Sequence, residues 1–231
     1  MNLSDNLGQI IRPANALYID QPANGQNVFT DPFQKCSNEE IDGVIKRLDT
    51  MMPDHGLRVA SLAVLRKPLH FYPGSMYYDL TQADTNPVRS IQIVLGKKAG
   101  HILDGSADKL AMFNLAFPLT LDKGNVADYA RFYFTHINGP HGRTIVVDTV
   151  DDIHFREEPT PALRKSLNDK IIPLAINAAL PDGGYQLRGT LLIRSALFSA
   201  TIDIDMTGNV SAHAARVLAD ILPVGDLALE G

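Results

Sequence analysis

Apolar residues recur with helical spacing shortly after a proline- and asparagine-rich start to the chain. Ser37 and Glu40 form a capping-box pattern. Four apolar side chains then fall on one face before Pro53 ends the pattern: Ile41, Val44, Ile45 and Leu48. This spacing predicts an amphipathic helix that lies on an apolar surface.

A second helical stripe follows Asn125, which is placed as an N-cap. Its members are Val126, Tyr129, Ala130, Tyr133, Phe134 and Ile137, and the opposite side carries Asp128, Arg131 and Thr135. Phe132 projects on this polar side, where we expect it to contact another element or a second copy of the chain. Two shorter helices are predicted, one from the cap Ser106 to Ala116 and one that begins at the cap Thr160.

Runs rich in apolar and β-branched residues predict strands in both halves of the chain. They cover residues 57–65, 71–80, 88–95, 144–147, 171–180, 185–194 and 197–206. In the last hairpin, Arg194 opposite Leu197 places apolar residues against each other on one face and Arg188 against Asp203 on the other. After a short strand at Val210, residues 214–221 are predicted to form a terminal helical turn.

These elements indicate an α+β fold, with helices packed on one face of a mainly antiparallel β-sheet and a C-terminal β-meander. The chain divides into a proline-rich N-terminal arm over residues 1–36, an α+β half over 37–120 and a helix–strand–helix–meander half over 121–231. The two halves are also compatible with one continuous domain.

The composition narrows the range of partners. The chain has 231 residues, of which 45% are hydrophobic, enough to bury a core, and its single cysteine, Cys36, excludes an internal disulfide scaffold. With 21 Lys and Arg against 26 Asp and Glu, the net charge of -5 provides no overall attraction for nucleic acid or an anionic membrane. No apolar run approaches the roughly 18 residues of a membrane helix, and the first residues do not resemble a secretory signal. We expect a cytoplasmic protein that binds neither membrane nor nucleic acid.

The densest group of chemistry-bearing side chains lies between His136 and Glu157. Imidazoles and carboxylates bind divalent metals, and a His–Asp pair is the minimal general base. The candidates for catalysis are His141, His154, Asp148 and Asp152, and the alternative is that all four are solvated loop residues. The sequence assigns neither a metal-binding set nor a cofactor, because it contains no motif specific to a phosphate-binding loop, a dinucleotide fold or a zinc protease.

Two weaker groups point to ligand binding. Backbone amides bracketed by glycine, beside an arginine, can hold a phosphate or carboxylate of a small anionic metabolite, and here they would involve Gly139, His141, Gly142 and Arg143. A plain helix stop is the alternative for that segment. Tyr72, Tyr77, Tyr78, Asp79 and His70 either line an aromatic pocket or belong to an ordinary strand.

Together these observations favour a small-ligand-binding or protein-interaction module that acts as a homo-oligomer. Its interface is expected at a sheet edge or a helix face. The alternative is a hydrolase or isomerase that uses a His–Asp general base, alone or with the help of a metal.

Overall fold

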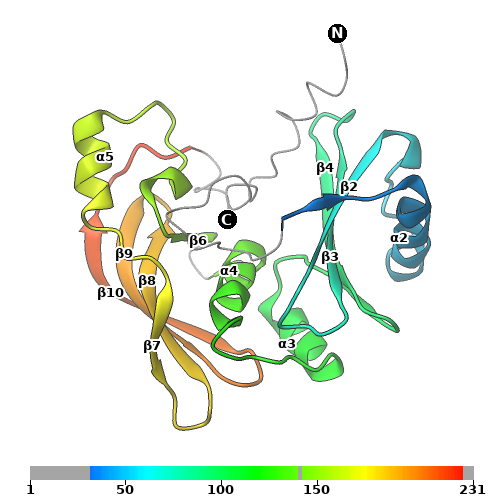
Figure 1. Ribbon diagram of the computed structural model, residues 1–231. Helices are drawn as coiled ribbons and strands as arrows, with labels where there is room; N and C mark the ends of the chain where they lie inside the picture. Colours follow the sequence, from blue (N-terminus) through cyan, green and yellow to red (C-terminus); the bar gives the residue numbers. More distant parts are fainter. Residues whose placement is uncertain (1–31, 140–141, 226–231) are drawn as a thin grey trace. The chain divides into compact units, whose positions relative to one another are not determined.

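The computed structural model of the protein describes residues 32–139 and 142–225 (Figure 1). These residues belong to two compact units, one that ends at Asp104 and one that begins at Gly105. The boundary falls earlier in the chain than the break expected near residue 120, so the helix that follows Ser106 belongs to the second unit. Of the arm predicted over residues 1–36, only residues 32–36 lie within the described residues.

The first unit is a meandering antiparallel sheet with one helix on it. Its elements are β1 (Gln34–Lys35), α2 (Asn38–Met51), the 3₁₀ turn η2 (Val59–Ser61), β2 (Leu62–Pro68), β3 (Met76–Gln82), β4 (Arg89–Leu95) and β5 (Gly100–Ile102). The strands lie in the order β1-β2-β3-β4-β5, and each neighbouring pair is antiparallel. β2 begins at Leu62 rather than at Leu57, because residues 59–61 form η2 and the Arg58 N–H donates to the Gln82 side chain.

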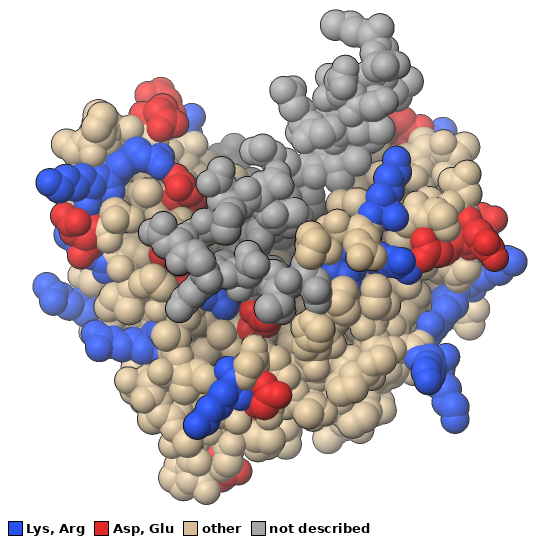
Figure 2. Space-filling model, viewed as in Figure 1, with Lys and Arg blue, Asp and Glu red and all other residues tan. Residues whose placement is uncertain are grey.

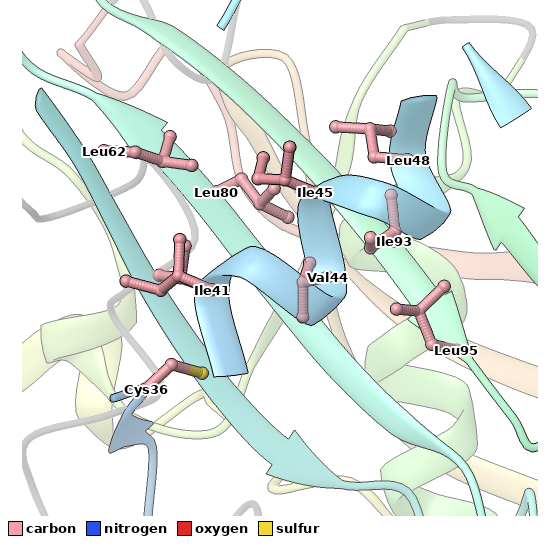
Figure 3. Close-up of a cluster of buried hydrophobic side chains, with 10 residues drawn as sticks. Cys36, Ile41, Val44, Ile45, Leu48, Leu62, Leu80, Ile93 and Leu95 are labelled. Atoms are coloured by element: carbon pink, nitrogen blue, oxygen red, sulfur yellow. The ribbon is translucent and has the colours of Figure 1, made fainter. Parts of the chain in front are cut away.

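Helix α2 begins and packs as the sequence predicts. The Ser37 hydroxyl accepts a hydrogen bond from the Glu40 N–H at 3.3 Å, and the Glu40 carboxylate accepts one from the Ser37 N–H at 2.8 Å. The four apolar residues of the predicted stripe are buried, and they meet Leu62, Leu80, Ile93 and Leu95 of the sheet (Figure 3). Removal of such side chains from water stabilises the unit by roughly 1.5–3 kcal/mol each.

The second unit also places helices on an antiparallel sheet. Its elements are α3 (Ala107–Ala116), α4 (Val126–His136), β6 (Thr144–Val147), the 3₁₀ turn η3 (Val150–Asp152), α5 (Pro161–Asn168), β7 (Ala175–Ala179), β8 (Tyr185–Ile193), β9 (Ala196–Ile204) and β10 (Val210–Ala219). The strand order is β10-β9-β8-β6, with β7 also paired to β8. The α+β class and the C-terminal meander are therefore confirmed, and the strands form one sheet in each unit.

β8 has two partners on the same side, and Gly189 marks the change between them. β6 pairs with residues 190–193 of β8, and β7 pairs with residues 185–188. Leu174, just before β7, lies directly against Gly189, where a Cβ atom would come within 3.1 Å of the Leu174 Cα. Only glycine leaves room for the chain to cross at this point.

The β8–β9 hairpin is confirmed, but its predicted register is wrong by two residues. Ile193 pairs with Ala196, so Arg188 lies opposite Thr201 and Asp203 lies opposite Gln186. The turn is made by Arg194 and Ser195, and Arg194 takes a left-handed φ of 56°. The alternation of faces survives because a shift of two residues keeps every side chain on its own face.

Residues 214–219 extend strand β10, so the predicted helical turn over residues 214–221 is wrong. β10 continues to Ala219 and pairs with β9 as far as Leu197. The ladder contains register shifts between Ala214 and Arg216 and between Val217 and Ala219. The edge of β9 provides hydrogen bonds along this whole segment, and they outweigh the weak local preference of an alanine-rich stretch for helix.

Helix α4 is buried on more than its predicted stripe. Arg131 and Phe132, which the pattern placed on the polar side, are 8% and 1% exposed. Phe132 is therefore not a surface side chain through which a second copy could bind. The hydrophobic stripe identifies one buried face of a helix but does not report how many other faces the fold covers.

The charged side chains of the surface are mixed in sign. On the face that Figure 2 shows, the described Lys and Arg side chains lie among Asp and Glu side chains and do not gather into one basic patch. This face therefore presents no extended cationic surface.

We expect Gly189→Ala to lower the free energy of unfolding by roughly 1–3 kcal/mol, because the new methyl group would meet the Leu174 backbone. Gly43→Ala in α2 is the matched control, since nothing lies within 4 Å of its added Cβ. In that helix alanine should stabilise by about 0.5–1 kcal/mol. Urea titrations of the two variants should shift the midpoint in opposite directions, and equal shifts would contradict the steric role of Gly189.

Candidate functional site

Helix α4, the end of β6 and the turn η3 bring charged side chains together inside the second unit. β6 ends in the buried residues Val146 and Val147, so Asp148 leaves the strand still inside the protein, at 7% exposure. The turn η3 begins two residues later and directs the Asp152 carboxylate back to the end of the strand. Arg131 reaches the same place from α4.

Arg131 and Asp148 form a buried ion pair. The Arg131 Nε and Nη2 atoms each lie 3.0 Å from Asp148 Oδ2. The other carboxylate oxygen of Asp148 accepts the Leu174 N–H at 2.7 Å. Asp128 on the same helix lies 3.7 Å from Arg131 Nη1 and adds a second, weaker partner. Both charges of the central pair are therefore compensated, as burial requires.

Asp152 closes the site by capping the turn that follows the strand. Its Oδ2 accepts the backbone N–H groups of Asp148 at 2.8 Å and Thr149 at 2.7 Å, and the Thr149 hydroxyl at 3.3 Å. Burial raises the pKa of the Asp152 carboxyl to about 6, and the charge of Asp148 adds to this increase in the pKa against the lowering effect of the hydrogen bonds. Asp152 therefore changes its charge near pH 6 inside the folded protein.

The contacts of Asp148 and Asp152 hold segments of the chain together, and the Asp152 carboxyl adds one group that titrates near pH 6. Both oxygens of Asp148 are used by Arg131 and Leu174, and one oxygen of Asp152 receives three donors. Asp128 and Asp148 share the Arg131 guanidinium, and Asp152 lies beside Asp148, so the group carries an excess of negative charge while Asp152 is ionised. When Asp152 is ionised, the chemical property that this group of side chains offers is the uptake of a proton by the Asp152 carboxylate.

The structure brings together two of the four residues predicted for catalysis. Asp148 and Asp152 are neighbours, joined by the Asp148 N–H. His154 lies two residues further along the chain, and its backbone carbonyl accepts the Gly225 N–H at 2.8 Å. His141 lies outside the described residues. Arg131, the cation that organises the pair, was missed because its helical position placed it with Asp128 and Thr135 on the polar side; the acidic run after strand 144–147 was the available signal.

Of the residues predicted to bind an anion, the described glycines Gly139 and Gly142 are paired with each other. The Gly139 N–H donates to the Gly142 carbonyl at 3.0 Å, and the Gly142 N–H donates back to the Gly139 carbonyl at 3.0 Å. These two amides are therefore occupied by the protein itself. Gly142 has a φ of 90°, in the left-handed region that favours glycine, and Arg143 follows it directly before β6.

In the first unit, the sheet face away from α2 carries a buried carboxylate. Asp79 on β3 is 3% exposed and accepts the hydroxyls of Thr81 at 3.0 Å and Ser90 at 3.1 Å. Burial raises its pKa against these hydrogen bonds. Tyr77 shares this face, whereas Tyr78 lies on the other face against the α2 core. The two tyrosines are therefore not part of a single pocket, because β3 directs them to opposite sides.

Comparisons with protein-family profiles, with curated proteins and with solved structures give no match for this chain. Among the described residues, no group of three or more His, Cys, Asp or Glu side chains is placed to hold a metal ion. None of the helices in the described part of the chain is both long and apolar enough to span a membrane.

The contacts Arg131–Asp148 and Arg164–Asp151 of the second unit should differ strongly in their effect on stability. Arg131→Ala leaves Asp148 buried without its cation, so we expect a loss of about 3–5 kcal/mol. Arg164→Ala removes a contact to Asp151 in which both side chains are at least a third exposed, and the expected loss is about 0–1 kcal/mol. Denaturant titrations measure both, and similar losses would contradict the importance of the buried pair.

Asp152 should make stability fall as the pH rises from about 4 to about 7. Its pKa is 3.8 in the unfolded reference and about 6 in the folded protein, so the folded state holds more protons between these values. The expected contribution is about 3 kcal/mol at about 1.4 kcal/mol per pKa unit, fully present below pH 4 and lost as the carboxyl ionises. Asp152→Asn should remove this component, so the stability difference between wild type and variant should change across the range. A constant difference would show that the pKa of Asp152 is not raised.

Proposed function

We propose that the protein is a protein-interaction module that acts as a homo-oligomer and uses the edge strand β10 to bind. The observation that carries this proposal is the exposure of β10. Among the described residues, β9 is the only strand paired with it, and β10 is the outermost strand of its sheet (Figure 1). Residues 211–217 are exposed along its length.

Hydrogen bonds at the preceding turn determine which backbone groups of β10 face outward. The Asp205 N–H donates to the Asn209 carbonyl at 3.2 Å, so these two residues form a hydrogen-bonded pair. Such pairs alternate with non-hydrogen-bonded pairs along an antiparallel ladder. Ser211 and His213 therefore direct their N–H and C=O groups to β9. The corresponding groups of Val210, Ala212 and Ala214 point away from it and are available to another strand.

The side chains of β10 do little to prevent such pairing. Natural edge strands are commonly protected by lysine, proline or inward-pointing charges. Residues 210–215 of β10 read Val-Ser-Ala-His-Ala-Ala and contain none of these. Their small side chains allow a second backbone to approach closely.

Two apolar side chains at the end of β10 support the same proposal. Val217 is 51% exposed, and Ile221 is 84% exposed. Ile221 also has a φ of 54°, a left-handed conformation that costs a β-branched residue roughly 1–2 kcal/mol. Contacts with a binding partner would explain why an exposed isoleucine is held in this conformation.

The contacts of the acidic site favour binding over catalysis. Asp148 is occupied by Arg131 and the Leu174 N–H, and Asp152 by the turn that it caps. The hydrolase or isomerase with a His–Asp base stays a prediction, because both oxygens of Asp148 and one oxygen of Asp152 are occupied by contacts within the chain. Binding of a small anionic metabolite also stays a prediction, with Arg143 as its remaining cation.

Ala212→Pro tests the proposal. Proline removes the outward N–H of residue 212 but none of the hydrogen bonds to β9. Each lost hydrogen bond costs about 1 kcal/mol, and one is lost per copy. We therefore expect the dissociation constant of the oligomer to rise at least about tenfold.

Light scattering after gel filtration, over a series of micromolar concentrations, measures this change. Ala212→Val is the matched control, because it keeps the N–H at the same exposed position, and it should remain oligomeric. A wild-type protein that is monomeric throughout the series would overturn the proposal.

A further inference from the structure

The regular part of the β10 edge is short, and its midpoint is a single residue. The ladder with β9 runs without interruption from Val210 to Ala214, and the first register shift follows between Ala214 and Arg216. Register shifts bend a strand and end regular pairing. The outward-facing backbone groups of this stretch belong to Val210, Ala212 and Ala214, and Ala212 lies at its centre.

A two-fold axis at Ala212 uses all of these groups. Resting on the proposed function, we propose that two copies pair through β10 in antiparallel orientation about a two-fold axis at Ala212. Val210 of each copy then lies opposite Ala214 of the partner subunit, and Ala212 lies opposite Ala212 of the partner subunit. Each of the three pairs exchanges two backbone hydrogen bonds, about six in all. The two sheets become one continuous intermolecular sheet.

The side chains match in this register. Ser211 lies opposite His213 of the partner subunit, in the closely spaced non-hydrogen-bonded position. The two side chains are suited to each other, because within one chain the Ser211 Oγ already lies 3.3 Å from His213 Nε2. On the other face the smallest apolar side chain, Ala212, meets itself on the axis. Moving the axis by one residue toward the C-terminus would instead place two imidazoles directly against each other.

Charges at the ends of the paired segment are complementary as well. Arg216 comes two residues after Ala214, and the proposed register places it at the end of the paired segment that meets the turn preceding β10 of the partner subunit. In that turn the Asp205 carboxylate accepts hydrogen bonds from Thr207 and Asn209, at 2.6 Å from the Thr207 hydroxyl and 2.8 Å from the Asn209 amide. Burial raises the pKa of Asp205, but the hydrogen bonds from Thr207 and Asn209 together lower it by more, so its pKa lies below the usual value and the carboxylate is ionised at neutral pH. Opposite charges at both ends of the pairing favour this register over its neighbours.

A scan with single cysteines reads the register directly. Four variants of the full chain, each with a single introduced cysteine, are treated with a mild oxidant: Ser211→Cys, Ala212→Cys, His213→Cys and Ala214→Cys. Opposite residues in a hydrogen-bonded pair lie about 5.5 Å apart at Cα, within the range that a disulfide spans. Ala212→Cys should therefore form covalent dimers several-fold more than the other three. All four positions are exposed, and the native Cys36 is buried, so wild type serves as the unlinked control.

A mixture of two variants gives a second signature. Ser211→Cys mixed with His213→Cys should form a mixed disulfide that neither variant forms alone, because these two positions oppose each other across the interface. A maximum at His213→Cys would overturn the register about Ala212.

A dimer in light scattering with no covalent product at any position would overturn pairing through β10, while the homo-oligomer itself would stand. A protein that remains monomeric in scattering would overturn both this inference and the proposed function.

Discussion

The packing of the second unit depends on the contacts of one buried residue, Asp148. It binds Arg131 of α4 with one oxygen and the Leu174 N–H with the other, and its own N–H is held by Asp152 of η3. Three regions that are distant in sequence, at Arg131, residues 148–152 and Leu174, are thus joined at one buried point. Taking a carboxylate and a guanidinium out of water costs several kcal/mol each, and only a complete set of partners offsets that cost. Leu174, which donates its N–H to Asp148, also lies against Gly189. At Gly189, β8 changes its partner from β7 to β6.

The buried carboxylates Asp79, Asp148 and Asp152 accept hydrogen bonds from within the chain. Asp148 and Asp152 are held by the contacts just described, and Asp79 in the first unit is held by Thr81 and Ser90. The backbone of β10 is different, because a strand at the end of a sheet keeps half of its hydrogen-bonding groups for a partner. For this reason our proposal places binding at β10 and gives the acidic site a role in stability.

The edge of β10 also shows how a fold limits the partner it can accept. The turn at Asp205–Asn209 sets the phase of the hydrogen bonds, and the register shift after Ala214 ends the regular segment. Between these two features the edge offers a short segment of small side chains. A short edge of this kind selects its partner strand mainly by which of its backbone N–H and C=O groups point outward, and less by the surface area that it buries.

The sequence by itself determined the elements whose signals are local. The capping box at Ser37 and Glu40, the apolar stripe of α2 and the caps Ser106 and Thr160 all act within a few residues, so the pattern predicts them correctly. The α+β class and the final meander follow from the order of these elements. For the site, the acidic run identified Asp148 and Asp152 but not their cation.

What only the tertiary structure decided depends on contacts between distant residues. The burial of Arg131, the two-residue shift of the β8–β9 hairpin and the continuation of β10 to Ala219 each result from a partner elsewhere in the chain. The helical pattern around Arg131 cannot show that Asp148, at the end of β6, is its partner. The alanine-rich segment of β10 forms a strand because it pairs with β9. Local preferences amount to a few tenths of a kcal/mol per residue, whereas the hydrogen bonds of a sheet ladder together contribute more than these preferences can oppose.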